Sequence, residues 1–208
     1  MKPLRLALFL ILAGITGGCA TVDPSAKVID PVPVYLAEYA IHSDLYMPTD
    51  DHYVAYTFGD WNYAALGHTW PNDAFGALFL SFQAALEKRI ASINRHTGAP
   101  DLREPPQLLI RLTASHELVR RRVGEMEKRF QDDLARYGSE GEVLKEDGTR
   151  IYVKDSEHYS IANDCNDLTA ATFRALGFGV KGIIVGSHFH ISSTAMVIQT
   201  QPVIEDSP

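Results

Sequence analysis

Two runs of aliphatic and aromatic residues, separated by a short polar segment, constrain the fold of this chain more than any other feature. The first run covers residues 34–47 and the second covers residues 52–58. The segment between them, Pro48-Thr49-Asp50-Asp51, has the composition of a turn. Two such runs around a turn predict an antiparallel hairpin.

Three later segments carry apolar residues at the spacing of an α-helix. They begin at Asn72 or Asp73, at Ser115, and at Asn163 or Asp164, and they extend to Ile93, Gly138 and Gly177. Shorter β-like runs cover residues 107–112, 151–153 and 182–198, whereas residues 139–150 have the composition of a polar loop. This mixture predicts an α+β fold with an antiparallel sheet packed against helices.

Length and composition suit a single folded domain that has no multiple disulfides and binds no nucleic acid, and we also expect no cofactor. The chain has 208 residues, of which 46% are apolar, and its formal net charge is −7. This apolar share is enough for a core, and the negative charge opposes binding to nucleic acid. Two cysteines exclude a framework of several disulfides and a zinc site made of four cysteines.

The first 18 residues have the pattern of an export signal. Lys2 and Arg5 precede an apolar stretch, residues 6–13, and small residues then lead to Cys19. The apolar stretch is too short for a membrane-spanning helix. The segment Thr16-Gly17-Gly18-Cys19 resembles a bacterial lipobox, in which the cysteine becomes lipidated. The alternative is an ordinary signal peptide in which this cysteine is incidental.

The resemblance to a lipobox implies a lipoprotein of the bacterial cell envelope. Its mature chain would begin at Cys19, and acyl chains such as palmitate would hold it at the membrane. Ala20 follows this cysteine, which by resemblance to Gram-negative sorting implies the periplasmic face of the outer membrane. We expect residues 19–33 to be a tether, residues 34–200 a single domain and residues 201–208 a tail.

Cys165 is then the only thiol left free in an exported chain. It lies in the first turn of a predicted helix, where unpaired N–H groups and the helix dipole favour a thiolate. Asp164 and Asp167 oppose this effect, because nearby negative charge raises the pKa of a cysteine. Cys165 is therefore a candidate nucleophile, and a small buried residue that packs a helix end is the alternative.

A cysteine nucleophile needs a proton acceptor, for which His42 is the first candidate. This histidine lies in the apolar run before the turn, where a buried imidazole needs a hydrogen-bond partner. In a hairpin centred on residues 50–51, residue 42 falls opposite residues 59–60, so Asp60 could orient the ring. The alternatives are a core histidine bonded to the backbone and a simple turn residue at position 60. His52 is a second candidate for the orienting group.

The remaining candidates give weaker signals. His158 and Asn163 precede Cys165 closely in the chain and are candidates for lining its pocket. His188 and His190 lie on one side of a predicted strand and could bind a metal. No third ligand is evident in the sequence, so we expect no metal site.

Together these residues resemble the circularly permuted NlpC-type papain-like proteins. The resemblance rests on three motifs: His42-Ser43-Asp44-Leu45, Phe58-Gly59-Asp60-Trp61 and the segment 163–171 around Cys165. The histidine precedes the cysteine in the chain, which is the order of the permuted type. More narrowly, the chain is similar to a family of uncharacterised bacterial lipoproteins within that group.

The resemblance implies a papain-like α+β fold and a thiol hydrolase (peptidase or amidase) or an acyltransferase. Cys165 would be the nucleophile, His42 the general base and Asp60 the third polar residue. The substrate would be an amide or an ester, in a peptidoglycan peptide or a lipid. A non-catalytic binding or structural lipoprotein on the same fold is the alternative.

Overall fold

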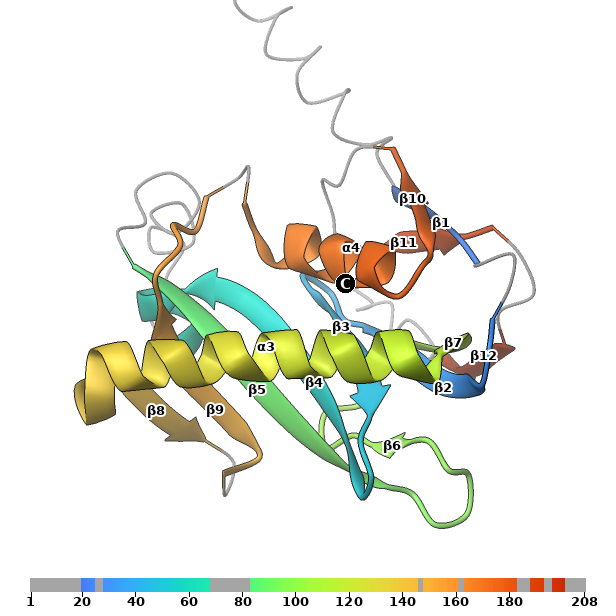
Figure 1. Ribbon diagram of the computed structural model, residues 1–208, viewed down its shortest axis with the longest axis horizontal. Coiled ribbons are helices and arrows are strands. Elements are labelled where there is room, and N and C mark those ends of the chain that lie inside the picture. Colours follow the sequence, from blue (N-terminus) through green and yellow to red (C-terminus); the bar gives the residue numbers. More distant parts are fainter. Residues whose placement is uncertain are drawn as a thin grey trace, which may run out of the picture.

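The chain folds into helices and antiparallel strands, which confirms the predicted α+β class. The computed structural model describes residues 20–24, 28–67, 83–145, 148–160, 163–182 and 188–192, together with the backbone of 196–200. Within these ranges the strands form a large sheet and a small sheet, and two α-helices pack on the large one (Figure 1).

The large sheet is antiparallel in every described pair, with the order β12-β7-β2-β3-β4-β5-β9-β8 and with β6 beside β5. Its strands are β2 (Pro31–Glu38), β3 (Ser43–Pro48), β4 (His52–Asp60), β5 (Ala84–Ile93), β6 (Pro100–Asp101), β7 (Leu108–Ser115), β8 (Glu142–Lys145), β9 (Arg150–Asp155) and β12 (Met196–Thr200). The strands β7 and β9 confirm the runs predicted at residues 107–112 and 151–153.

The predicted hairpin around residues 48–51 is present as β3 and β4, with Met47 paired to Val54 and Pro48 to Tyr53. The first run is not one strand, however. It divides into β2 and β3, which pair with each other, and residues 39–42 form the turn between them. The sequence placed His42 within a strand, but this residue lies in the turn just before β3.

Two α-helices lie on one side of the large sheet (Figure 1). α3 (His116–Tyr137) begins after Ser115 and ends at Gly138, which has a φ of 62°, as the sequence predicts. α4 (Cys165–Ala175) begins after Asp164, and Gly177 follows its end with a φ of 86°. Two shorter helices are η1 (Trp61–Ala65) and η2 (Gly138–Gly141).

The large sheet has two unlike faces, because successive side chains along a strand point to opposite sides. One face packs against α3 and α4 in a cluster that includes Leu36, Leu45 and Leu86, and we call it the helical face. The other carries a second cluster, whose tyrosines are Tyr35, Tyr39, Tyr46 and Tyr53, and we call it the tyrosine face.

The helix predicted to extend to Ile93 is wrong from residue 84 onward, where the chain forms β5. Leu86 and Ile90 fit a helical spacing of four residues, but the same spacing also places both on one face of a strand. Glu87 and Arg89 then share the other face, where they form ion pairs with each other, with Asp44 on β3 and with Arg150 on β9. The beginning of the predicted helix, up to residue 82, lies outside the described residues.

Residues 139–150 are also not simply a loop, because η2 and β8 occupy residues 138–145. The sequence signal was weak, since β8 is an edge strand of four residues with Leu144 exposed. The predicted strands in 182–198 are confirmed as two short ones, β11 (Phe189–Ile191) and β12.

The small sheet contains part of the segment predicted to be a tether. β1 (Ala20–Asp23) lies between β10 (Gly179–Lys181) and β11. Ala20 and Val22 are buried there, and β2 begins at Pro31, so the tether prediction does not hold for these residues. Among the described helices, none combines the length and the apolar composition needed to cross a membrane.

Candidate functional site

Cys165 is the first residue of α4, as the sequence predicts, and the start of this helix is firmly capped. The carboxylate of Asp164 accepts hydrogen bonds from the backbone N–H of Asn166 at 2.8 Å and of Asp167 at 3.2 Å. The Asp167 carboxylate accepts one in return from the N–H of Asp164 at 3.1 Å, which completes a capping box. The turn that carries the thiol is therefore fixed in position.

The first turns of α4 also dock on the start of β3. The hydroxyl of Thr169 donates to the backbone carbonyl of Ser43 at 3.1 Å, and both residues are buried. This contact joins two segments that lie 126 positions apart in the chain. It brings the segment of Cys165 close to the segment that follows His42, as a shared site would require.

Burial, and after it the charges of Asp164 and Asp44, raise the pKa of the Cys165 thiol, which lies at about 12. The backbone N–H groups of Asn166 and of Cys165 itself lower it, as expected at a helix N-terminus. Burial and the two carboxylates outweigh the N–H groups, so the resting residue is a thiol at neutral pH. A base must therefore take its proton before it can act as a nucleophile.

His42 is a partly buried imidazole in the turn between β2 and β3. Its ring stacks on Tyr39 with a centroid distance of 4.6 Å, and its Nε2 lies 3.8 Å from Oδ2 of Asp44. Within the described part of the chain, Nε2 is buried without a hydrogen-bond partner. Burial lowers the pKa of His42 more than Asp44 raises it, so the ring is neutral at pH 7 and can accept a proton.

Among the described contacts, no hydrogen bond joins the thiol of Cys165 to the imidazole of His42. Cys165 begins a helix on the helical face, whereas His42 stacks on Tyr39, which belongs to the tyrosine face. What they share is Asp44 on β3, because its charge acts on the pKa values of both groups.

Asp60, the predicted orienting group, is the last residue of β4. Its carboxylate is the N-cap of η1 and accepts a hydrogen bond from the N–H of Tyr63 at 2.8 Å. The carboxylate of Asp44, which the sequence analysis did not single out as a site residue, lies beside His42. Asp44 is the second residue after His42, but no local pattern shows that its carboxylate is buried beside the ring.

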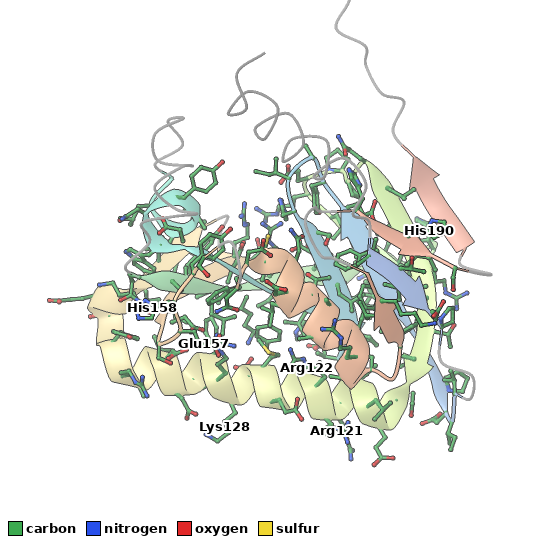
Figure 2. All side chains as sticks on the ribbon, turned by 90° about the horizontal axis from the view of Figure 1, so that it is seen from above. Arg121, Arg122, Lys128, Glu157, His158 and His190 are labelled. Atoms are coloured by element: carbon green, nitrogen blue, oxygen red, sulfur yellow. The ribbon has the colours of Figure 1, made fainter. Side chains whose placement is uncertain are left out.

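His158 and Asn163 lie close to each other on the approach to α4. The Asn163 side-chain amide donates to the backbone carbonyl of His158 at 2.9 Å, while the His158 side chain is exposed. Figure 2 shows His158 and Glu157 near α3, where Glu157 pairs with Arg129 at 3.3 Å. Cys19, the predicted lipidation site, lies outside the described residues.

Asp44 belongs to a row of alternating charges on the tyrosine face, which we call the charge row: Asp44, Arg89, Glu87 and Arg150. The Nη1 of Arg89 donates to Oδ2 of Asp44 at 2.9 Å, and its Nε donates to Oε1 of Glu87 at 2.8 Å. The Nε of Arg150 donates to the same Glu87 oxygen at 2.6 Å. Asp44, Arg89 and Glu87 are all buried.

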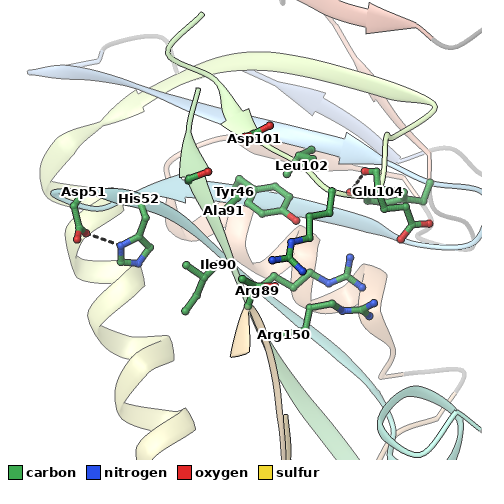
Figure 3. Close-up of a pocket in the computed structure, with 14 residues that line it drawn as sticks. Tyr46, Asp51, His52, Arg89, Ile90, Ala91, Asp101, Leu102, Glu104 and Arg150 are labelled. Carbon is green, nitrogen blue, oxygen red and sulfur yellow. Dashed lines mark hydrogen bonds and ion pairs between the residues drawn. The ribbon is translucent and has the colours of Figure 1, made fainter. Parts of the chain in front are cut away.

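A cavity of about 610 Å³ opens on the tyrosine face beside the charge row (Figure 3). Tyr39 and Tyr46 form part of its wall, and Arg89 and Arg150 contribute guanidinium groups. Asp101, the last residue of β6, and Glu104, from the segment after it, add carboxylates. The cavity is close to His42, because Tyr39 both lines the cavity and stacks on the imidazole.

His188 and His190 join no metal-binding cluster with the other described residues. In the described part of the chain, no group of three or more histidine, cysteine or acidic side chains could hold a metal ion. His188 lies 3.1 Å from the carboxylate of Glu38 instead, and His190 belongs to β11 in the small sheet (Figure 2).

The chain matches no protein-family model, no curated protein and no solved structure. Its function is therefore inferred from the chemistry of the site, since a fold by itself does not determine an activity.

Proposed function

We propose that this protein is a thiol hydrolase or acyltransferase with a papain-like fold, in which Cys165 is the nucleophile and His42 the general base. The observation that carries the proposal is the place of Asp44. Its carboxylate is fully buried and lies 3.8 Å from the imidazole, and its charge also raises the pKa of the Cys165 thiol. A neutral imidazole and a helix-end thiol around one buried carboxylate are the parts that such chemistry needs.

In the proposed reaction, the neutral ring of His42 accepts the thiol proton as the sulfur of Cys165 attacks the carbonyl carbon of an amide or ester. The backbone N–H of Cys165 stabilises the oxyanion. The leaving amine or alcohol takes the proton from the imidazolium as the tetrahedral intermediate collapses to a thioester. Water then releases the acid, or an acceptor takes the acyl group. The step requires the ring to approach the thiol when substrate binds, since catalytic hydrogen bonds often form only in that complex.

The proposed substrate is an amide in a peptide, with peptidoglycan peptides preferred over acylated lipids. The cavity beside His42 supports a peptide, because it offers both guanidinium and carboxylate groups to a ligand with charges of both signs. The proposed location, with Cys19 lipidated at the periplasmic face of the outer membrane, would place the site near the cell wall.

A second candidate function is non-catalytic binding at the cell envelope. The observation that favours it is the state of the thiol: its pKa is raised to about 12, and no described contact joins it to the imidazole. In this alternative the cavity binds a ligand and Cys165 only packs the start of α4.

Turnover by matched variants separates the two candidates. Purified protein is incubated with peptidoglycan peptides and with a short-chain aryl ester, and the release of acid and amine or alcohol is followed. The proposal expects Cys165→Ala to abolish turnover with an unchanged circular dichroism spectrum. Turnover that persists in Cys165→Ala would reject Cys165 as the nucleophile, and turnover that is absent from the natural protein on every substrate would favour the binding function.

A further inference from the structure

The charge row on the tyrosine face is a costly arrangement for a protein core. Three of its four members, Asp44, Arg89 and Glu87, are buried, and removing a charge from water is unfavourable unless partners compensate. Hydrophobic residues of similar volume would often stabilise a core at least as well. We therefore expect the charge row to have a function other than stability, and the residues that it contacts indicate which one.

The row reaches from β9 to β3 across two intervening strands. Arg89 on β5 is paired in register with Ala55 on β4, a residue that is fully buried and has only a methyl side chain. Strands two positions apart are about 9–10 Å from each other, so a side chain that bridges them needs a small residue beneath it. Ala55 provides this space, and the guanidinium of Arg89 crosses β4 to bond with Asp44.

The other end of the row holds Arg89 in place. Arg89 and Arg150 are directly opposite in the β5–β9 register, where two like charges repel. Glu87 resolves the repulsion, because its Oε1 accepts from the Nε of both guanidinium groups, and its Oε2 accepts from Nη2 of Arg89 at 3.2 Å. The bidentate contact fixes the plane of the Arg89 guanidinium.

The end of the row at β3 contacts the imidazole. The same Oδ2 atom of Asp44 that accepts from Arg89 lies 3.8 Å from Nε2 of His42. The other carboxylate oxygen, Oδ1, has no hydrogen-bond partner among the described residues. Arg89 is therefore the group that sets the orientation of this carboxylate.

We propose that Arg89 is a positioning residue that acts on His42 by holding the carboxylate of Asp44 in one orientation. Glu87 and Arg150 contribute to this positioning, because they hold the guanidinium of Arg89 in place. This inference rests on the proposed function, because it takes His42 as the proton acceptor of the reaction. Arg89 itself touches neither the thiol nor, in the proposed reaction, the scissile bond.

The groups that surround His42 determine the sign of the expected effect. Burial lowers the pKa of His42, and among the nearby charges Asp44, Glu87 and Glu104 raise it whereas Arg89 lowers it. Removing the Arg89 charge makes the pair of Asp44 and His42 bind a proton more readily, whichever of the two carries it. The apparent pKa of the pair must then rise.

Titration of the His42 ring by NMR in the full-length protein tests this inference without any substrate. The signal is assigned by its loss in His42→Gln. We expect Arg89→Met to move the midpoint of the His42 titration to higher pH and Arg89→Lys to restore most of the natural midpoint. The matched control is Arg111→Met on β7, an exposed arginine outside the charge row, which should leave the midpoint unchanged.

An unchanged midpoint in folded Arg89→Met, or an equal change in Arg111→Met, would overturn the inference. If Arg89→Met does not fold, Arg150→Met is measured instead, with a smaller change in the same direction expected and no change counting against the inference. This titration can be judged separately from the proposed function. If the His42 midpoint responds to Arg89 but the protein shows no thiol-dependent turnover, the proposed reaction is rejected and the effect of Arg89 on His42 still holds.

Discussion

The carboxylate of Asp44 lies 3.8 Å from the imidazole of His42, two residues earlier in the chain. This pair forms where the turn after β2 meets the first residues of β3. Asp44 is fully buried, and the ring beside it is mostly shielded from water, with 22% of the side chain exposed. The balance between burial, this carboxylate and the charges of Arg89, Glu87 and Glu104 decides whether the ring is charged, and several measurable properties depend on it.

The alkylation rate of Cys165 should depend steeply on pH. Because burial raises the pKa of the thiol to about 12, the thiolate fraction should increase about tenfold for each pH unit throughout the range from 7 to 10. Asp164→Asn removes a charge that raises this pKa and still caps the helix, so it should react faster with iodoacetamide at pH 8. The control is Asp132→Asn, which removes an exposed carboxylate on α3. A rate that levels off below pH 8 would contradict the raised pKa.

The two long helices should respond differently to loss of their N-cap side chains. Asp164 accepts two backbone hydrogen bonds at the start of α4, whereas the Ser115 side chain makes none at the start of α3. Urea denaturation should show that Asp164→Ala lowers the free energy of unfolding by about 1 kcal/mol, and that Ser115→Ala changes it far less. Equal losses would mean that the capping box contributes no stability.

Acid should destabilise the protein partly through His42. The folded-state pKa of this ring lies below the model-peptide value of 6.5. Between these two pKa values His42 is therefore protonated in the unfolded chain and neutral in the native protein. The associated stability is present above pH 6.5 and is lost as the pH falls from there through the folded-state pKa. Unfolding measured between pH 7.5 and 5 should show a weaker decline for His42→Gln than for the natural protein. His96→Gln, an exposed control, should follow the natural protein.

Glu87 should be the most sensitive member of the charge row. It is buried and accepts hydrogen bonds from both Arg89 and Arg150, so Glu87→Gln leaves two facing guanidinium groups without the charge between them. We expect a loss of about 3–5 kcal/mol in the free energy of unfolding. Asp132→Asn breaks an exposed pair with Lys128 on α3 and should cost less than about 1 kcal/mol. Comparable losses in the two variants would contradict the energetic role of the row.

Local patterns were sufficient to predict much of the fold. The caps and glycines around α3 and α4 define those helices, and the turn at Pro48–Asp51 defines the β3–β4 hairpin. The sequence failed at β5, because residues four apart share a face in a helix and in a strand alike. It failed at residues 39–42 because an apolar stretch shows no break where two strands are joined by a tight turn.

The candidate site was only partly predictable for a similar reason. The place of Cys165 at a helix start follows from local sequence, and His42 follows from its apolar surroundings. The role of Asp44 depends on Arg89, which is 45 residues away and was assigned to a helix. A buried carboxylate can be recognised in a sequence only when its distant partner is known, and no local pattern supplies that partner.

Acyl transfer to Cys165 is the direct test of this residue as nucleophile and of His42 as its base. The natural protein and His42→Gln are incubated at pH 7.5 with an excess of an aryl acetate ester, quenched in acid and mapped by peptide mass spectrometry. We expect a thioester-linked acetyl group on Cys165 in the natural protein and a strongly reduced amount in His42→Gln. Absence of acylation at Cys165, or equal acylation in the two proteins, would contradict it.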